Sequence, residues 1–343
     1  MHRSQITIDL RAVRHNVRRL RLAAAGAELW AVVKASGYGH GAVDVARAAL
    51  EEGATALCVA TAAEGSVLRE RFRDARILIL AGADDETIDA ARAQGFEVAV
   101  SALPIPEGVP VHLKVDTGMG RWGMSIEDAA GVAAGQVVGV MTHLATADER
   151  DGRFASEQLG RFREVAARFP GATCHAANSA ATLRLAESRF DAVRCGLALY
   201  GLSPFHDDPR GHGLEPVLSW RSLVSVEKVL EPHESTGYGR RFVAQERTRI
   251  GLVPVGYADG FPRALSGAEV LVGGKAARVL GAVSMDSFAV SLPTGAGAGS
   301  GVTLIGDGLL AEAHAQRLET ITYELVCGIS TSPTRCCREV IDG

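Results

Sequence analysis

The feature of this 343-residue chain that most restricts its fold is a regular alternation of apolar, strand-like runs with helix-like stretches in the first 200 residues. The helix-like stretches are rich in Ala, Glu and Arg, and most strand-like runs begin about 20 to 35 residues apart. Eight such runs can be distinguished, at residues 29–34, 55–60, 76–80, 97–100, 111–115, 137–142, 172–175 and 191–194.

This alternation predicts parallel βαβ units, and eight of them close most naturally into a TIM-type (β/α)8 barrel of the α/β class. The alternative is an open, doubly wound sheet, but the GxGxxG motif typical of that fold is absent after the first run. One interval breaks the pattern. Residues 101–110 contain Pro104, Pro106 and Pro110, which leaves no room for a crossover helix. We therefore predict that the helix after the fourth strand is missing.

The alternation of strand-like and helix-like segments ends near residue 220. Short β-type runs at residues 223–226, 250–253, 276–280, 288–290 and 302–305 are separated by Gly, Pro and Ser, and a helical period returns only around residues 309–318. We predict a barrel domain over residues 10–219 and a mostly β C-terminal domain over residues 220–343, which residues 1–9 join as a strand.

Composition excludes several functional classes. The chain has 36 Lys and Arg against 40 Asp and Glu, a net charge of −4, and this balance argues against nucleic-acid and anionic-membrane partners. No run of about eighteen apolar residues indicates a membrane-spanning helix, and the start does not resemble a secretory signal. The six cysteines lack metal-ligand spacing, which favours reduced thiols, a cytoplasmic location and no metal site.

Polar residues follow several predicted strands, at the end of a barrel where active sites lie. Lys34 ends the first strand, Arg121 lies in a glycine-rich loop after the fifth, and His143 ends the sixth. Asn178 and Ser179 follow the seventh strand, and Arg194 and Gly196 end the eighth, where backbone N–H groups often hold phosphate. A lysine, two arginines, a histidine and a phosphate cradle suit an aldehyde cofactor with a phosphate, and pyridoxal 5′-phosphate fits best.

Seven motifs then occur in the order found in alanine racemases, and the chain resembles that family over nearly its whole length. They are AVVKASGYGHG (31–41), KVDTGMGR (114–121), TH (142–143), ANSA (177–180), VRCGLALYG (193–201), GYADG (256–260) and MD (285–286). The resemblance implies a fold-type III pyridoxal phosphate enzyme, with an N-terminal barrel, a C-terminal β domain, and a homodimer whose subunits share active sites.

The resemblance also implies roles for individual residues. Lys34 would bind the cofactor covalently and act as one of two bases. Tyr257, supplied by the other subunit, would be the second base on the opposite face of the α-carbon, because inversion needs one base on each face. Arg194 would face the pyridine nitrogen, and His143 would link Arg194 to Tyr257 and lower the pKa of the phenol.

The remaining positions concern the phosphate and the substrate. Arg121 would contact the phenolic oxygen of the cofactor and the substrate carboxylate, and Lys114 would hold Arg121 if its amine is carbamylated. Met285 of the other subunit would bind the substrate carboxylate through its N–H. Cofactor binding would also involve Tyr38, Asn178, Ser179, Gly196 and Leu197.

The sequence departs from the family pattern at Ser36, Ser284 and Cys195, where the family usually has Asn, Cys and Pro. Thr331 stands where a tyrosine normally reaches the phosphate and narrows the substrate entrance. Its loss should widen the substrate corridor. We therefore expect a racemase of alanine, with two alternatives kept open: a racemase of broader specificity, for serine or another amino acid, and a non-catalytic pyridoxal phosphate-binding relative. Arg194 disfavours a fold-type III decarboxylase.

Overall fold

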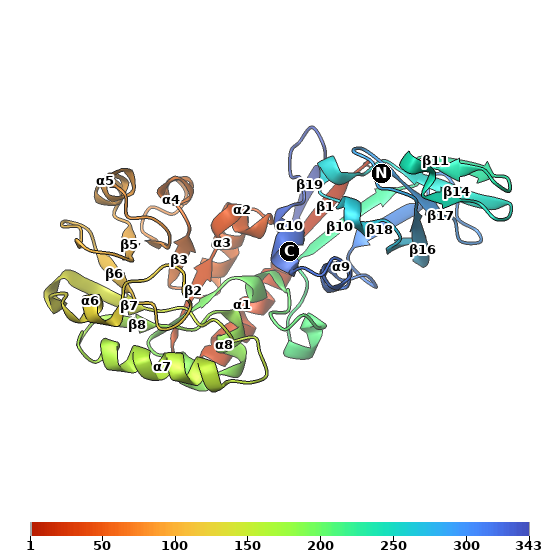
Figure 1. Cartoon of the computed structure of the whole chain (residues 1–343). Helices are drawn as coiled ribbons and strands as arrows, with labels where there is room; N and C mark the ends of the chain where they lie inside the picture. The colour runs from red at the N-terminus through yellow and green to blue at the C-terminus, as the bar shows by residue number, and fades with distance from the viewer. Residues whose placement is uncertain (1, 343) are drawn as a thin grey trace. The chain divides into compact units, whose positions relative to one another are not determined.

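The computed structural model describes residues 2–342, and these residues divide into two units. One unit comprises residues 12–215, and the other comprises residues 2–11 together with residues 216–342. Figure 1 shows the first unit in red to green and most of the second in green to blue.

The first unit is a closed barrel of eight parallel strands in sequence order, as predicted. Each predicted strand is confirmed with ends that differ by no more than two residues. One face of each strand points into the barrel interior and the other packs against helices, so most of the strand residues are apolar. The strands are β2 (Glu28–Val32), β3 (Ala56–Val59), β4 (Arg76–Ile79), β5 (Glu97–Val100), β6 (Val111–Lys114), β7 (Val137–Met141), β8 (Thr173–His175) and β9 (Ala192–Cys195).

The helices of the barrel begin and end at recognisable signals. Thr61 and Glu64 form a capping box at the start of α4, and Asp84 caps α5, which ends before the left-handed Gly95. No helix lies between β5 and β6, as the three prolines predict. The helices are α1 (Leu10–Ala24), α3 (Ala42–Glu51), α4 (Ala62–Arg69), α5 (Asp85–Gln94), α6 (Ile126–Ala130), α7 (Arg153–Ala166) and α8 (Ser179–Arg184).

The second unit is built on a nine-stranded sheet in the order β11-β14-β17-β16-β15-β18-β10-β1-β19. The N-terminal strand β1 lies between β10 and β19, antiparallel to the first and parallel to the second. The strands are β1 (Gln5–Asp9), β10 (Leu218–Leu223), β11 (Val226–Leu230), β14 (Thr248–Val253), β15 (Glu269–Val272), β16 (Lys275–Leu280), β17 (Phe288–Ser291), β18 (Gly301–Ile305) and β19 (Cys337–Ile341), with a short hairpin of β12 (Ser235–Thr236) and β13 (Phe242–Val243).

Two details of this unit differ from the prediction. The run at residues 223–226 is not one strand, because the chain crosses there from β10, which pairs with β18, to β11, which pairs with β14. Val224 and Ser225 instead donate backbone hydrogen bonds to Ser300 and Leu252. The helical region near the C-terminus contains α9 (Ala311–Arg317) and a second helix, α10 (Thr322–Cys327), that the periodicity did not reveal.

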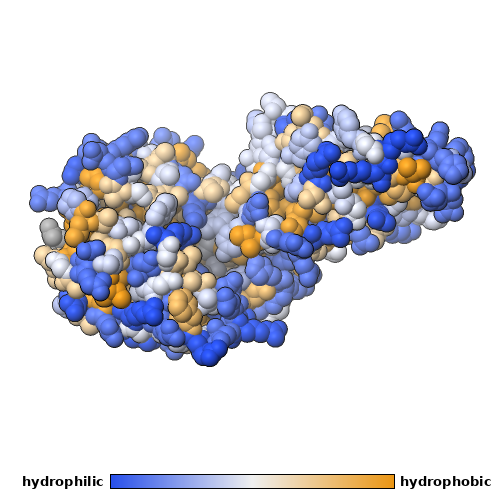
Figure 2. Space-filling view, viewed as in Figure 1, coloured by the Kyte–Doolittle hydropathy of each residue, from blue (hydrophilic) through white to orange (hydrophobic). Residues whose placement is uncertain are grey.

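The visible surface of each unit mixes hydrophilic and hydrophobic residues, with hydrophilic ones over much of it (Figure 2). Within residues 2–342, no helix combines the length and the apolar character needed to cross a membrane.

Candidate functional site

Lys34 begins a short turn with an unusual backbone, directly after β2. The segment α2 (Lys34–Tyr38) has positive φ angles at Ala35 (51°), Ser36 (52°), Gly37 (63°) and Tyr38 (52°). Three of these are not glycine, and left-handed backbone costs such residues about 1–2 kcal/mol each. Strain of this kind is maintained where surrounding contacts over-determine it, and it is concentrated at functional sites.

Glu64 is one contact that holds this turn. Its two carboxylate oxygens accept hydrogen bonds from the backbone N–H of Ala35, at 2.7 Å, and of Ala60, at 2.7 Å. The same side chain completes the capping box of α4. Gly37 is required as well, because a Cβ there would lie 3.0 Å from the backbone nitrogen of Ala42. The residue after the candidate reactive lysine is therefore fixed by the first turn of α4.

Four cations act on His143, which follows β7 at the carboxyl end of the barrel strands. Burial, followed by the charges of Arg194, Arg121, Lys114 and Lys34, lowers the pKa of His143 to about 3. The imidazole is therefore neutral at physiological pH and can both donate and accept a hydrogen bond. A concentration of positive charge with this neutral histidine among it suits an anionic ligand.

Lys114 is one of these cations, and its pKa is strongly lowered. It ends β6, is buried, and lies with Nζ 5.4 Å from the centroid of the Trp122 ring. Burial lowers its pKa to about 8, with further lowering by Arg194, Arg121 and Lys34. A larger fraction of this amine is therefore neutral near pH 7 than of an ordinary lysine, and the neutral amine is the nucleophilic form. The Arg121 side chain is exposed and makes no hydrogen bond to any residue from 2 to 342.

The segment that follows β9 forms a compact cradle with the start of α8. The hydroxyl of Ser179 accepts hydrogen bonds from the N–H of Gly196, at 3.1 Å, and of Ala198, at 3.2 Å. A Cβ at Gly196 would lie 2.6 Å from Oη of Tyr38, so only glycine admits the phenol here. Leu197 begins the 3₁₀ turn Leu197–Tyr200. The structure thus brings Tyr38, Ser179, Gly196 and Leu197 together, as a phosphate site requires.

Asn178 has a different use in the structure from the one that the sequence suggests. Its Oδ1 accepts a hydrogen bond from the N–H of Ala181 at 3.0 Å, which makes it the N-cap of α8. The side chain is only partly buried, so a contact of its amide nitrogen with a ligand is compatible with the cap.

Arg194 heads a chain of buried hydrogen bonds through the barrel interior. Its Nη1 lies 2.6 Å from Nδ1 of His175, Nε2 of His175 lies 2.8 Å from Nδ1 of His112, and Nε2 of His112 lies 2.7 Å from a carboxylate oxygen of Glu97. Arg76 bonds the other oxygen of Glu97 at 2.6 Å. These five residues come from the strands β9, β8, β6, β5 and β4.

The direction of this chain follows from its two ends. A guanidinium can only donate, so Nδ1 of His175 accepts and its Nε2–H donates to His112. His112 then donates Nε2–H to the carboxylate. Burial lowers the pKa of His175 and His112, which keeps both rings neutral in these tautomers. Burial also lowers the pKa of Arg194, to about 10, so Arg194 remains a cation.

The chain orients Arg194 and leaves one of its donors available. Besides His175, the Nη atoms donate to the carbonyl oxygens of Thr142, at 2.7 Å, and Ala176, at 3.3 Å. Among the residues that the structure describes, none accepts a hydrogen bond from Nε of Arg194. A ligand atom with a lone pair can therefore meet this fixed N–H.

Replacing Glu97 with glutamine is expected to destabilise the barrel by about 1–3 kcal/mol at pH 7, because the amide nitrogen faces the donors of His112 or Arg76. Burial would raise the pKa of Glu97, but hydrogen bonds from His112 and Arg76 outweigh burial and lower it below 4.5. This stabilisation is present above pH 4.5 and is lost as pH falls through the lower folded-state pKa. Urea unfolding of both proteins at pH 7 and at pH 3 measures the difference.

The control for this prediction is Asp151→Asn, which removes a carboxylate from a surface pair with Arg153. This variant should unfold at the wild-type urea concentration. Equal stability of the Glu97 variant and the wild type at pH 7 would contradict the directional chain.

The second unit carries the other predicted site residues. Tyr257 begins the 3₁₀ turn Tyr257–Asp259, and its side chain is 42% exposed. Met285 is 53% exposed, and the two segments are joined by hydrogen bonds from Tyr257 N to Ser284 O, at 3.1 Å, and from Ala258 N to Met285 O, at 3.0 Å. Thr331 is exposed in the same unit.

Several residues of these arrangements were not predicted from the sequence. Glu64, Glu97, His112 and His175 are polar residues within or beside apolar runs, and none stands at the end of a strand next to a glycine-rich loop. Only His175, three residues before Asn178, lies close to a recognisable motif. The tight fit of Gly139, whose added Cβ would lie 2.1 Å from Nδ1 of His112, is a feature of the folded barrel alone.

Comparison with known proteins places this geometry in context. The family model described as "Alanine racemase, N-terminal domain" matches residues 8–204, and the one described as "Alanine racemase, C-terminal domain" matches residues 217–337. The chain is 39% identical to an alanine racemase of Symbiobacterium thermophilum, covering 94% of each protein. It is 38% identical to alanine racemase 1 of Bacillus subtilis, covering 96% of this chain and 91% of the relative.

Solved structures agree with these matches. The crystal structure of an alanine racemase from a D-cycloserine-producing Streptomyces lavendulae superposes with a TM-score of 0.94 at 38% sequence identity, and the match covers 100% of this chain and 98% of that chain.

Proposed function

Because this chain belongs to the alanine racemase family, we propose that it interconverts L- and D-alanine with pyridoxal 5′-phosphate as cofactor. The observation that carries the proposal is the set of four cations around the neutral His143, one of which is Lys34 at its strained turn. The cradle of Ser179, Gly196 and Tyr38 supports it further, because a Cβ at position 196 would fill the space against the Tyr38 hydroxyl.

The residues present fit this cofactor. Lys34 would hold its aldehyde carbon through the side-chain amine, and Tyr38, Ser179, Gly196 and Leu197 would hold the phosphate. Asn178 and His143 would lie against the ring. When bound, pyridoxal phosphate provides an electron sink that makes the α-proton of an amino acid removable. Arg194 would donate Nε–H to the pyridine nitrogen. It does not release its proton readily, so it would leave that nitrogen unprotonated and limit side reactions.

Inversion at the α-carbon needs a base on each face. We assign these roles to Lys34 and to Tyr257 of the partner subunit. Tyr257 and Met285 are exposed on their own chain, which is consistent with a homodimer in which they complete the neighbouring site. His143, which is neutral, could donate a hydrogen bond to the ionised oxygen of Tyr257 of the partner subunit, and such a donor stabilises that form. Arg121 and the N–H of Met285 of the partner subunit would hold the substrate carboxylate.

The experiment that tests the proposal follows the α-proton. The purified protein, with pyridoxal phosphate and L-alanine in D₂O, is expected to form D-alanine and to replace the α-proton with deuterium, as seen by NMR. Absence of both the D-isomer and α-deuteration would refute racemase activity on alanine. Cofactor binding without α-proton exchange on any amino acid would favour a non-catalytic relative.

Thr331 supports a second candidate, a racemase with broader specificity. A threonine leaves open the space that a tyrosine ring would fill, and Thr331 is exposed. Measuring α-proton exchange for serine and for larger amino acids in the same assay decides between the candidates. Rates that are comparable with the alanine rate would favour the broader enzyme, and exchange restricted to alanine would exclude it.

Lys114 is expected to form a carbamate with carbon dioxide. With a pKa of about 8, about a tenth of its amine is neutral at pH 7, far more than for an ordinary lysine with a pKa of about 10.4. The resulting carboxylate would give the exposed Arg121 an anionic partner. Protein equilibrated with ¹³C-bicarbonate should show a carbamate signal by ¹³C NMR, and the signal should disappear in Lys114→Met but not in Lys275→Met. A spectrum without that signal between pH 7 and pH 9 would contradict the prediction.

A further inference from the structure

The turn that carries Tyr257 lies directly on the segment that carries Met285. A Cβ at Gly256 would lie 2.3 Å from the carbonyl oxygens of both Ser284 and Met285, so the two backbones are in contact. The hydrogen bonds from Tyr257 and Ala258 to this segment join the two loops. Any displacement of one loop therefore displaces the other.

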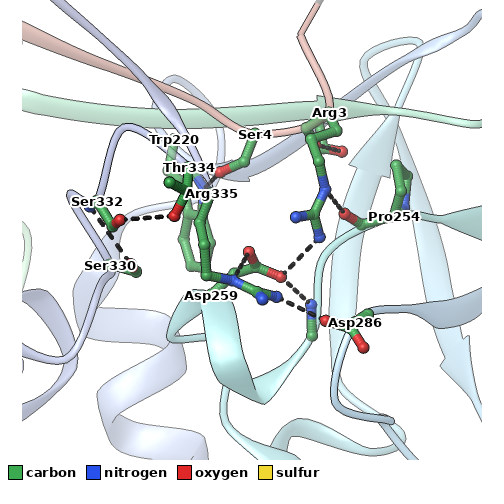
Figure 3. Close-up of polar contacts among 12 residues, drawn as sticks. Arg3, Ser4, Trp220, Pro254, Asp259, Asp286, Ser330, Ser332, Thr334 and Arg335 are labelled. Carbon is green, nitrogen blue, oxygen red and sulfur yellow. Dashed lines mark hydrogen bonds and ion pairs between the residues drawn. The ribbon is translucent and has the colours of Figure 1, made fainter.

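Asp259 ends this turn with a carboxylate that is almost completely buried, at 2% exposure. Its Oδ2 accepts hydrogen bonds from the N–H of Gly256, at 2.9 Å, and from Nη2 of Arg3, at 3.1 Å. Its Oδ1 accepts one from Nε of Arg335, at 2.8 Å. Figure 3 shows Arg3 and Arg335 reaching Asp259 from different sides.

Arg335 extends this cluster to the Met285 segment. Its Nη2 donates to Oδ1 of Asp286 at 2.7 Å, one residue after Met285. These two carboxylates raise the pKa of Arg335. Arg3 makes a second anchor, because its Nε donates to the carbonyl oxygen of Pro254, at 3.0 Å, on the other side of the turn. The C-terminal segment adds a hydrogen bond from Ser330 N to Asp259 O at 3.0 Å.

Stability alone is a weak explanation for such a cluster. A buried ion pair loses hydration, and replacing one by apolar residues is often neutral or stabilising. An arginine guanidinium has N–H donors in a rigid planar arrangement, so one arginine can hold two carboxylates at fixed distances from each other. Here the two carboxylates belong to the two loops whose exposed residues are the candidate base and the candidate carboxylate-binding N–H.

We propose that Asp259 and Arg335 are positioning residues, which hold the Tyr257 phenol and the Met285 N–H in one rigid arrangement for the partner subunit's active site. The inference rests on the proposed function for its catalytic meaning, but the mechanical link between the loops stands on the hydrogen bonds alone. Tyr257 and Met285 contact the substrate, whereas Asp259 and Arg335 act only through them.

The test compares Arg335→Gln with the wild type, both as full-length protein with pyridoxal phosphate. Misplacement of a catalytic group by about 1 Å can cost about 100-fold in rate, so racemisation and α-proton exchange from L-alanine should fall about 10- to 100-fold. Exchange from D-alanine, in which Lys34 is the base, should fall less, because it depends on the Met285 contact with the substrate carboxylate but not on the Tyr257 phenol. A purely structural effect would lower exchange from both isomers by the same factor.

A second measurement does not depend on activity. Amide hydrogen–deuterium exchange should become faster in peptides covering residues 254–261 and 284–287, and remain unchanged in peptides from the barrel. The milder variant Asp286→Asn, whose parent side chain is 63% exposed, leaves the buried carboxylate intact. It should show the same pattern with a smaller change. If Arg335→Gln does not fold, Asp286→Asn alone decides the question.

The matched control is Arg249→Gln, which removes an arginine from a 2.7 Å ion pair with Glu227 elsewhere in the same unit. This variant should keep the wild-type ratio of L- to D-alanine exchange. Equal loss from both isomers, or unchanged amide exchange at residues 254–261 and 284–287, would overturn the inference. If the wild type itself exchanges no α-proton, the proposed function fails, and the amide exchange still decides whether the cluster holds the loops.

Discussion

Replacing Lys34 with alanine is expected to abolish racemisation, with a loss of more than about 1,000-fold, because the same amine binds the cofactor and moves a proton. The absorbance band of covalently bound pyridoxal phosphate should disappear as well. Both effects are measured on purified protein, by chiral chromatography of alanine and by the visible spectrum.

The attachment site can also be identified directly. The chain has only four lysines, Lys34, Lys114, Lys228 and Lys275. Borohydride reduction followed by peptide mass spectrometry should place the cofactor on the peptide that contains Lys34. The control variant Lys228→Ala, on strand β11 of the other unit, should keep full activity. A label on another lysine would contradict the assignment of Lys34.

Replacing Tyr257 with phenylalanine should lower exchange from L-alanine by about 100- to 10,000-fold, the range for loss of a general acid–base group. Exchange from D-alanine and binding of pyridoxal phosphate should persist, because Lys34 is unchanged. NMR in D₂O, started separately from each isomer, measures both rates.

Tyr238 provides the control for this variant. It lies in the same unit and is 70% exposed, so Tyr238→Phe removes an exposed phenol without affecting the turn at residue 257. Wild-type turnover is expected. Unchanged turnover in Tyr257→Phe would refute its assignment as a base.

The barrel could be predicted closely because both faces of each strand are buried. A run such as residues 76–80 is apolar throughout, and Pro104, Pro106 and Pro110 prevent a helix locally. The β-rich unit was less predictable. The run at residues 223–226 has the residue types of a strand, but whether it pairs depends on β14 and β18, which lie far along the chain.

The same distinction applies to the site. Lys34, Arg121 and Arg194 could be proposed because each lies at or after the end of a predicted strand, with glycines a few residues away. Asp259 and Arg335 are 76 residues apart, and no local sequence pattern predicts the contact between them. Nothing in the sequence around His112 distinguishes it from an ordinary interior residue of β6. Its partners Glu97 and His175 are supplied by barrel closure, which sets strand neighbours that sequence spacing does not reveal.

Gly139 has no Cβ, and this leaves room for the His112 ring. Positions 139 and 112 therefore depend on each other, although Gly139 has no side chain that could take part in the hydrogen-bond chain. Replacing Gly139 with alanine would push the His112 ring away from His175. The hydrogen bond between the two rings would be lost, and with it part of the chain that orients Arg194. Only a smaller residue at position 112 would make a side chain at 139 acceptable. Substitution at position 139 is therefore tolerated only after His112 has been replaced. The intermediate variant lacks the His112 ring, so the hydrogen-bond chain that orients Arg194 is already broken in it.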